Sequence, residues 1–260
     1  MYNQSKGSNA NNKVFHINSS IENDSNIDSI VKKFWELEEI PKESTKIYSE
    51  EQQECEEIFR NSVRRLSSGR FEVLLPFKSD TKLLGSSFET AKRRFISLER
   101  KLSKNNEIEQ MYHDFMKEYF DLGHMSIVDK IPDFPYYFIP HQCVLRPQSS
   151  TTKLRVVFDA SCRTSTHVSH LLMVGPTVQE ELYSTLIRFR FHKYAITADI
   201  EKMYRQVLVG ENDKNYQLIL WRQNPSDSLN VFRLNTVTYG TASAPFLAIR
   251  CLIQLSDLYK

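Results

Sequence analysis

The chain has 260 residues, which is enough for one or two domains at roughly 150 residues each. Its composition, 40% hydrophobic and 12% aromatic, is that of a folded globular protein, and its formal net charge of +2 excludes a histone-like polybasic protein while leaving room for a locally basic groove. Four cysteines without a CxxC pair favour reduced thiols, and no run approaches the ~18 apolar residues of a membrane span. We therefore expect a cytoplasmic protein with no membrane partner.

The first part of the chain is expected to be mainly helical. Residues 1–27 are polar and without periodicity, which predicts a disordered tail. Apolar residues within 30–37 favour a short amphipathic helix, and Ser49 with Gln52 forms a capping-box pair at the start of a second helix. Alternating residues at 71–75 then predict a strand.

Two longer amphipathic helices follow. Ser86 and Glu89 form another capping-box pair, and apolar residues at helical spacing continue to Leu102. The opposite side of this helix is basic, and it either contacts a nucleic-acid backbone or is a solvated helix face. A further helix is expected at residues 108–122, and Gly123 suits the position just after its end.

A connector rich in proline and aromatic residues, at 131–140, marks the expected internal boundary. Beyond it, strands are expected at residues 153–160, 194–200, 215–222 and 231–239, and helical stretches near residues 178–189 and 244–255. The fold class is therefore α+β. The expected division is a disordered tail at 1–27, a mainly helical segment at 28–130 and an α+β region at 131–260.

One acidic residue is notable for its position. Residues 194–200 are expected to form an apolar strand that delivers Asp199 at its C-terminal end, and Tyr204 follows five positions later. A carboxylate fixed at a strand end is well placed to hold Mg²⁺ while the site stays open to substrate. The alternative is an aspartate that caps a helix or forms a salt bridge.

Two further stretches each allow a functional and a purely structural interpretation. Residues 238–246 join a strand to a helix through five small residues with Pro245 in the first turn, so the helix can approach a base pair or simply pack on the sheet. Lys153 and Arg155 flank Leu154 on a strand, where they can bind phosphate oxygens or form an ordinary exposed face.

In their order and content these stretches resemble the reverse transcriptase region of Pao/BEL-type LTR retrotransposon Pol polyproteins. The motifs that carry the resemblance are TTKLRVVFDAS (151–161), LLMVGP (171–176), TADIEKMYRQV (197–207), ILWR (219–222) and TVTYGTASAPFLAIR (236–250). Upstream it extends through FWELEEIP (34–41), SGRFEVLLPF (68–77), AKRRFISLERKL (91–102) and YFDLGHM (119–125). The resemblance implies right-hand polymerase fingers and the first half of a palm at residues 131–260, preceded by the mainly helical segment.

The resemblance also implies roles in catalysis. Asp199 would be the first catalytic carboxylate of the palm, and the backbone carbonyl of Ile200 would help to hold Mg²⁺. Two Mg²⁺ ions would activate the primer 3′-hydroxyl and stabilise the leaving pyrophosphate. Tyr204 would be a steric gate whose ring excludes the 2′-hydroxyl of a ribonucleotide, the alternative being that it simply packs in the palm.

Further residues are implied to contact the substrates. Arg155, helped by Lys153, would contact the triphosphate of the incoming nucleotide. Tyr239 and Gly240 would line the nucleotide pocket. The residues expected to face the template and primer are Thr241, Ala242, Ser243, Ala244 and Pro245.

The family function is RNA-templated DNA synthesis, and it requires a second acidic motif, Tyr-x-Asp-Asp. This sequence contains no Asp-Asp pair and ends at Lys260, so we expect a truncated fragment that is inactive by itself. The alternative is a non-catalytic nucleic-acid-binding or host-repurposed remnant. The implied partners are an RNA or DNA template–primer, dNTP and the remainder of the Pol polyprotein, in the cytoplasm or in a retrotransposon particle.

Overall fold

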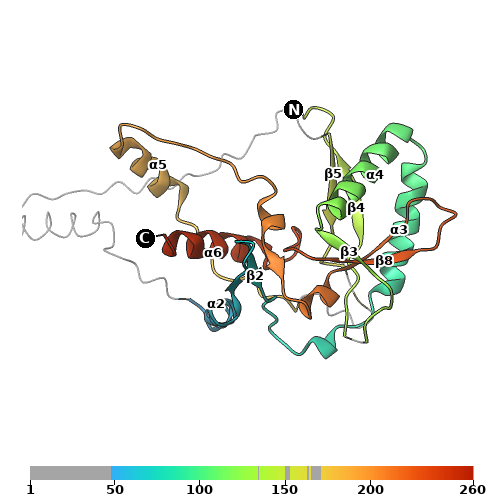
Figure 1. Ribbon diagram of the computed structural model, residues 1–260, viewed down its shortest axis with the longest axis horizontal. Helices are drawn as coiled ribbons and strands as arrows, with labels where there is room; N and C mark the ends of the chain where they lie inside the picture. The colour runs from blue at the N-terminus through green and yellow to red at the C-terminus, as the bar shows by residue number, and fades with distance from the viewer. Residues whose placement is uncertain (1–47, 134, 150–152, 163, 165–170, 260) are drawn as a thin grey trace, which may run out of the picture. The chain divides into compact units, whose positions relative to one another are not determined.

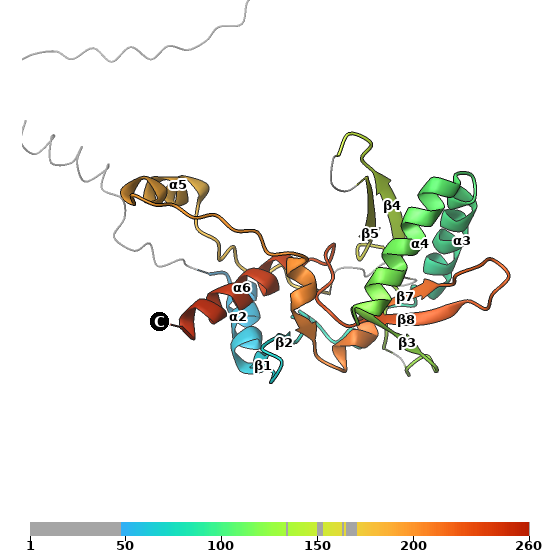
Figure 2. The same ribbon diagram turned by 45° about the horizontal axis from the view of Figure 1, so that its top comes forward.

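The computed structural model describes residues 48–259 except 134, 150–152, 163 and 165–170, and Figures 1 and 2 show it in two orientations. The described part is a mixed α+β structure with small sheets, which confirms the expected class. The helices are α2 (Glu50–Ser62), α3 (Phe88–Leu102), α4 (Asn106–Asp121), α5 (Leu182–Phe191) and α6 (Ala244–Asp257). The strands are β1 (Arg64–Arg65), β2 (Phe71–Val73), β3 (Met125–Val128), β4 (His141–Leu145), β5 (Leu154–Phe158), β6 (Leu208–Val209), β7 (Leu218–Trp221) and β8 (Asn230–Leu234). Short 3₁₀ helices are η1 (Thr81–Leu83), η2 (Met203–Gln206) and η3 (Asp213–Tyr216).

Two expectations lie outside the described residues, namely the tail at 1–27 and the helix at 30–37. Among the helices that the structure does describe, none combines the length and the apolar character needed to cross a membrane.

Helix α2 begins where its capping box predicts. The Ser49 hydroxyl accepts a hydrogen bond from the Gln52 backbone N–H at 3.3 Å, and Gln52 Oε1 accepts one from the Ser49 N–H at 3.1 Å. These reciprocal bonds satisfy donors that the first helical turn leaves without a partner. The sequence thus places the start of this helix correctly.

Helix α3 begins one residue later than the Ser86–Glu89 pair predicts. Its N-cap is Ser87, whose hydroxyl makes no capping bond and instead accepts a hydrogen bond from the Phe138 backbone N–H at 2.8 Å. Ser87 and Phe138 are fully buried, and a buried backbone N–H needs a partner. The hydroxyl therefore stabilises the connector instead of the helix.

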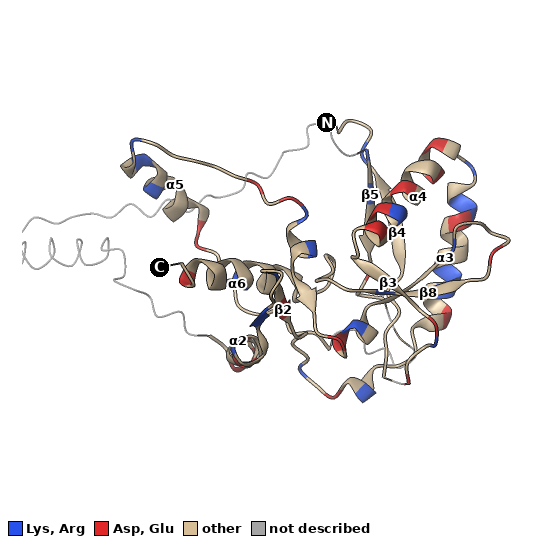
Figure 3. Cartoon of the chain, viewed as in Figure 1, with Lys and Arg blue, Asp and Glu red and all other residues tan. Residues whose placement is uncertain are grey.

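The basic side of α3 is visible in Figure 3, which colours Lys and Arg blue. Arg93, Arg100 and Lys101 are exposed, as a solvated helix face requires. Arg94 differs, because it forms an ion pair with Asp159 at 2.6 Å and so contacts the end of β5. One basic residue of this face thus has a structural partner.

Helix α4 has a well-defined cap at each end. The Asn105 side chain accepts hydrogen bonds from the backbone N–H groups of Glu107 and Ile108, at 3.0 and 3.2 Å. At the other end, Gly123 has a φ of +70°, a conformation that glycine adopts easily, and His124 N–H donates to the Tyr119 carbonyl at 3.0 Å. The predicted role of Gly123 is confirmed.

Three small sheets contain the described strands. Strand β8 lies between β3 and β7 and is antiparallel to both, while β4 and β5 form an antiparallel pair with His141 opposite Phe158. In the third sheet, β2 pairs antiparallel with β1 and parallel with β6. The strands expected at 153–160, 215–222 and 231–239 are present, although each is shorter than predicted.

The expected strand at residues 194–200 is wrong. The helical stretch before it is confirmed as α5, but the segment that follows is extended chain, and none of the described strands pairs with it. Its apolar side chains are exposed, with Tyr194 at 77% and Ile196 at 88%. Apolar periodicity indicates what a strand would bury, whereas a strand also needs a neighbour that hydrogen-bonds to it.

Two buried clusters form the core of the unit Tyr48–Lys260, and both extend across the expected boundary at residue 131. The first packs helices α3 and α4 on strands β4, β5 and β7. The second packs α2 and β2 against β6 and α6, and it contains Cys55 and Cys251 as free, buried thiols. The helical segment and the strands that follow it therefore share their hydrophobic contacts.

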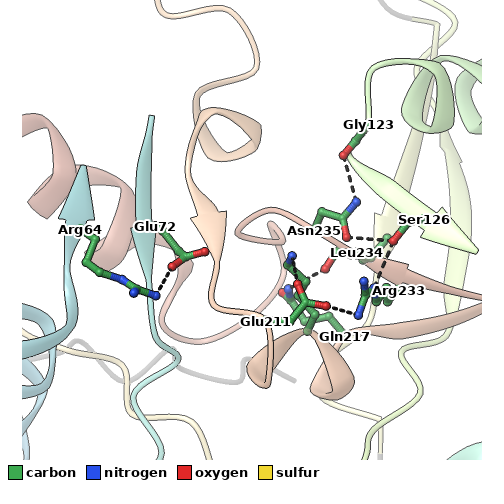
Figure 4. A network of polar contacts seen from close by, with 10 residues as sticks. Arg64, Glu72, Gly123, Ser126, Glu211, Gln217, Arg233, Leu234 and Asn235 are labelled. Carbon is green, nitrogen blue, oxygen red and sulfur yellow. Dashed lines mark hydrogen bonds and ion pairs between the residues drawn. The ribbon is translucent and has the colours of Figure 1, made fainter. Parts of the chain in front are cut away.

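A polar network joins the end of α4 to β8, as Figure 4 shows. Asn235 Nδ2 donates to the Gly123 carbonyl at 3.0 Å, and Asn235 Oδ1 accepts from the Ser126 hydroxyl at 3.1 Å. Arg233 Nε donates to the same hydroxyl at 3.1 Å, and the Arg233 guanidinium also forms an ion pair with Glu211. These bonds fix the α4–β3 turn against the chain that leaves β8.

His141 on β4 is a buried polar side chain within the first core, 3% exposed. Its Nε2 lies 2.8 Å from the Leu220 carbonyl, and its Nδ1 is hydrogen-bonded to the Tyr112 hydroxyl. Because a carbonyl only accepts, Nε2 carries the proton and Nδ1 accepts from the hydroxyl. Burial lowers the pKa of His141 to about 4, so the ring is neutral near pH 7.

We expect the free energy of unfolding to decrease as the pH falls from about 6.5 toward 4. In this range the unfolded chain binds a proton at residue 141 that the folded chain does not, so protonation favours unfolding. A pKa difference of this size corresponds to about 3 kcal/mol. Urea unfolding followed by circular dichroism across the pH range measures the change.

The matched variants are His141→Phe and His192→Gln. The first removes the titrating ring and should make the pH dependence shallower, although part of it remains because burial also lowers the pKa of His124 to about 4. The second changes an exposed histidine and should leave the slope intact. An unchanged slope in His141→Phe would contradict the assignment.

Candidate nucleotide-binding site

Arg155, Tyr204 and Tyr239, which are far apart in the sequence, line one cavity of about 640 Å³. Arg155 comes from β5, Tyr204 from η2 and Tyr239 from the chain after β8. The rest of the lining includes Glu118 from α4, Lys202 just before η2 and Arg205 within η2. The fold thus gathers three of the residues that the sequence resemblance assigns to nucleotide binding.

A second cavity of about 390 Å³ has Tyr204 in its wall as well. The small residues that line it are Gly240, Thr241, Ala242, Ala244 and Pro245. Ser243 is fully buried and is not among the lining residues. The expected template-facing segment is therefore divided: most of it lines the cavity, while Ser243 packs inward at the start of α6.

The turn that carries Tyr204 is held by Arg70. The Arg70 guanidinium donates to the backbone carbonyl of Arg205 at 2.6 Å and to that of Gln206 at 3.1 Å. Carbonyls at the end of a helical turn have no partner within the turn, and a cationic side chain satisfies them well. This contact joins the chain before β2 to η2 and fixes the position of the Tyr204 backbone.

Tyr239 is tied to strand β5. Its hydroxyl donates to the Val156 carbonyl at 2.8 Å, and its ring packs on Phe158 with centroids 5.3 Å apart. Burial raises the pKa of Tyr239, and the charges of Arg205 and Arg155 partly offset that rise. The tyrosine is neutral near pH 7 and lies in a region of positive charge.

Gly240 passes very close to the same strand. Its φ is +97°, and a Cβ atom at this position would lie 2.3 Å from the carbonyl oxygen of Phe158. Glycine is required here both by the backbone conformation and by the close approach of β5. The cavity wall after β8 therefore depends on the absence of a side chain.

Three further expected site residues lie outside the two cavities. Lys153 is exposed just before β5 and is not among the residues that line the two cavities. Asp199 and Ile200 lie in the exposed extended segment after α5 and do not line them either. Arg155, by contrast, is exposed on β5 and lines the first cavity.

Asp199 does not belong to a cluster of metal-binding side chains in the part of the chain that the structure describes. Among the side chains that the structure describes, no three or more His, Cys, Asp or Glu gather closely enough to hold a metal ion. An octahedral cation such as Mg²⁺ is usually held by one or two carboxylates together with substrate phosphates and water. The metal-binding role of Asp199 and the Ile200 carbonyl stays a prediction.

Sequence reasoning identified Arg155 but not the other charged residues of the first cavity, Glu118, Lys202 and Arg205. Arg205 is buried, 4.5 Å from the ring centroid of Tyr119 and 5.0 Å from that of Phe115, and it forms an ion pair with Glu118. Lys202 is also paired with Glu118. The two cations flank Tyr204 in the motif, but their shared partner is on a helix more than eighty residues earlier, which no local pattern indicates.

No family model matches the chain, and no curated protein matches it. The resemblance to the Pao/BEL reverse transcriptase region therefore rests on the sequence motifs quoted above. Its consequences for function are developed below as a proposal.

We expect Gly240→Ala to destabilise the protein by roughly 2 kcal/mol or more, because the new methyl group meets a backbone carbonyl that has little freedom to move. Gly69→Ala is the matched control: its φ is +83°, but a Cβ there meets no atom within 4 Å. The control should lower the free energy of unfolding by only about 1 kcal/mol, because only the unfavourable backbone conformation contributes there. Urea unfolding measures both, and equal losses would show that the contact with Phe158 is unimportant.

Proposed function

We propose that this chain is part of an RNA-directed DNA polymerase of the Pao/BEL retrotransposon type, and that the cavity lined by Arg155, Tyr204 and Tyr239 binds the incoming deoxynucleotide. The observation that carries the proposal is that these three residues, assigned from sequence motifs, line one cavity. Its volume of about 640 Å³ suits a nucleotide, since small-molecule sites are typically about 300–1,000 Å³.

Each residue type suits a different part of a nucleotide. The guanidinium of Arg155 matches the oxygens of a phosphate and can bind two of them at once. The ring of Tyr204 is suited to lie against the sugar, where it leaves no room for a 2′-hydroxyl. The small residues of the second cavity, from Gly240 to Pro245, leave space for a base pair next to that sugar.

In this proposal the strand that carries Arg155 belongs to the fingers and the turn that carries Tyr204 belongs to the palm. Helices α3 and α4 share their core with strands β4, β5 and β7, which supports assigning these helices to the same unit as the fingers strands. We infer that the helical segment stabilises the polymerase region by packing on it.

The second candidate function is nucleic-acid binding without catalysis, including a host-repurposed role. It is favoured by the position of Asp199, which is exposed and is not among the residues that line the two cavities. The sequence also has no adjacent pair of aspartates, whereas two-metal catalysis requires several oxygen ligands around the reacting phosphate. We therefore expect the 260-residue polypeptide to bind nucleotide and primer–template without extending the primer.

The gate is tested with Tyr204→Val. The wild-type chain should bind dGTP at least about tenfold more tightly than GTP, roughly 1.4 kcal/mol, because the ring excludes the 2′-hydroxyl. The variant should bind both nucleotides with similar affinity in calorimetric titrations that include Mg²⁺. Tyr183→Val, at an exposed aromatic position on α5, should keep the wild-type preference. Equal binding of dGTP and GTP by the wild type would sink the proposed role of Tyr204.

Catalysis is tested by primer extension on an RNA template with Mg²⁺ and all four dNTPs. We expect binding of the primer–template that weakens steeply with added salt, and no incorporation. Incorporation that disappears in Asp199→Asn would show that the polypeptide carries a complete catalytic centre. That result would reject the non-catalytic candidate.

A further inference from the structure

One carboxylate in the wall of the first cavity neutralises two cations. Glu118 Oε1 lies 2.9 Å from Lys202 Nζ and 3.4 Å from Arg205 Nη1. The Glu118 side chain is 48% exposed, so it lies at the border between the cavity and solvent. A single oxygen therefore forms both ion pairs, and Lys202 Nζ also lies 3.2 Å from Oε1 of Glu201, whose side chain is 85% exposed and does not line the cavity.

The charges that line this cavity do not balance. Its lining has three cationic side chains, Arg155, Lys202 and Arg205, and Glu118 as the one carboxylate. The positive charge of these side chains also acts on the nearby His124. Burial lowers the pKa of His124 to about 4, and the charges of Arg205, Arg70 and Lys202 contribute to this decrease. The cavity therefore attracts anions even while Glu118 is in place.

The two cations held by Glu118 differ in their freedom to move. Arg205 is buried and packs over the rings of Phe115 and Tyr119, so its guanidinium is fixed. The Lys202 side chain is 31% exposed, and lysine has a flexible stem. Lys202 can therefore leave Glu118 while Arg205 continues to neutralise the carboxylate.

The backbone at Lys202 is also unusual. Its φ is +52°, and it is the single non-glycine residue with positive φ in the part of the chain that the structure describes. This conformation is unfavourable for a side chain that is not glycine, and it persists only where surrounding contacts hold it. It directs the chain into η2, so that Lys202 and Tyr204 line the same cavity.

We propose that Lys202 is a phosphate ligand in this cavity, and that Glu118 is an internal competitor which a polyphosphate displaces. The proposal rests on the nucleotide-binding function proposed above and names a further ligand for the triphosphate. The phosphate chain lies between Arg155 on β5 and Lys202 at η2. In the ligand-free chain the Lys202 ammonium is paired with Glu118 in the cavity wall and with the largely exposed Glu201, and the phosphate takes the place of Glu118.

The test is a calorimetric titration of the 260-residue chain with inorganic tripolyphosphate, which has neither sugar nor base. Glu118→Gln should bind roughly threefold to tenfold more tightly, the effect of one partly exposed ion pair. Lys202→Gln should bind about tenfold more weakly, and Lys202→Arg should recover most of the affinity because it keeps the charge. The gain from Glu118→Gln should shrink when Lys202→Gln is also present, since competition for the ammonium has ended.

Matched controls separate this effect from general changes in charge. Glu107→Gln removes an exposed carboxylate at the other end of α4, and Lys101→Gln removes an exposed cation of α3. Each should change the affinity by less than about twofold. If the Gln variants at 118 or 202 unfold, Glu118→Asp, which shortens the side chain, and Lys202→Asn, which removes the charge and tolerates the positive φ, provide the same comparison.

The outcomes distinguish this proposal from the nucleotide-binding function. If Lys202→Gln weakens binding no more than Lys101→Gln, or if Glu118→Gln does not tighten it, the role of these residues is rejected. If tripolyphosphate binding depends on Lys202 but the wild type does not prefer dGTP over GTP, the phosphate site is supported and the polymerase function is rejected. If Arg155→Gln weakens tripolyphosphate binding while Lys202→Gln does not, or if the wild type does not bind tripolyphosphate, the present proposal is overturned.

Discussion

The chain that leaves β8 contacts strand β5 at two backbone carbonyls, one through a hydrogen bond and one through a close approach. Both cavities depend on this contact. The Tyr239 hydroxyl bonds to the Val156 carbonyl, and Gly240 passes so close to Phe158 that a side chain does not fit. The same few residues connect the two cores, because Val237 belongs to the second core while Tyr239 packs on the first. Fixing this short segment therefore fixes the walls of the two cavities and the packing of the two clusters at once.

Helix α4 shows how one element contributes to both packing and charge. Its buried side holds Tyr112, Met116 and Tyr119 in the first core. Phe115 and Glu118, three residues apart, share a neighbouring strip of the helix and line the cavity. The helix must pack as it does for Glu118 to reach Lys202 and Arg205. The charge pattern of the cavity is thus a consequence of the core, which explains why it involves residues so far apart in the sequence.

The sequence was sufficient for features that depend on neighbouring residues. The Ser49–Gln52 capping box, the α4 helix with Gly123 after it, and the strand of Arg155 follow from local spacing and backbone preference. Prediction from the sequence failed where a contact with a residue far away in the sequence determines the local structure. Ser87 hydrogen-bonds to Phe138, fifty-one residues away, so the α3 cap differs from the prediction, and residues 194–200 have no strand to pair with among those described. The resemblance did select Arg155, Tyr204 and Tyr239, but it did not indicate Glu118, because an ion pair across the fold has no local signature.

The two thiols of the second core have a practical consequence. Cys55 and Cys251 are almost completely inaccessible, and burial, with nearby glutamates in the case of Cys55, raises the pKa of each to about 12. Only the thiolate reacts rapidly with alkylating reagents, so both sulfur atoms are protected twice, by enclosure and by protonation. Cys55 is on α2 and Cys251 is on α6, the two helices that close this core. The rate at which an alkylating reagent modifies them, followed by mass spectrometry, therefore measures how often these two helices separate.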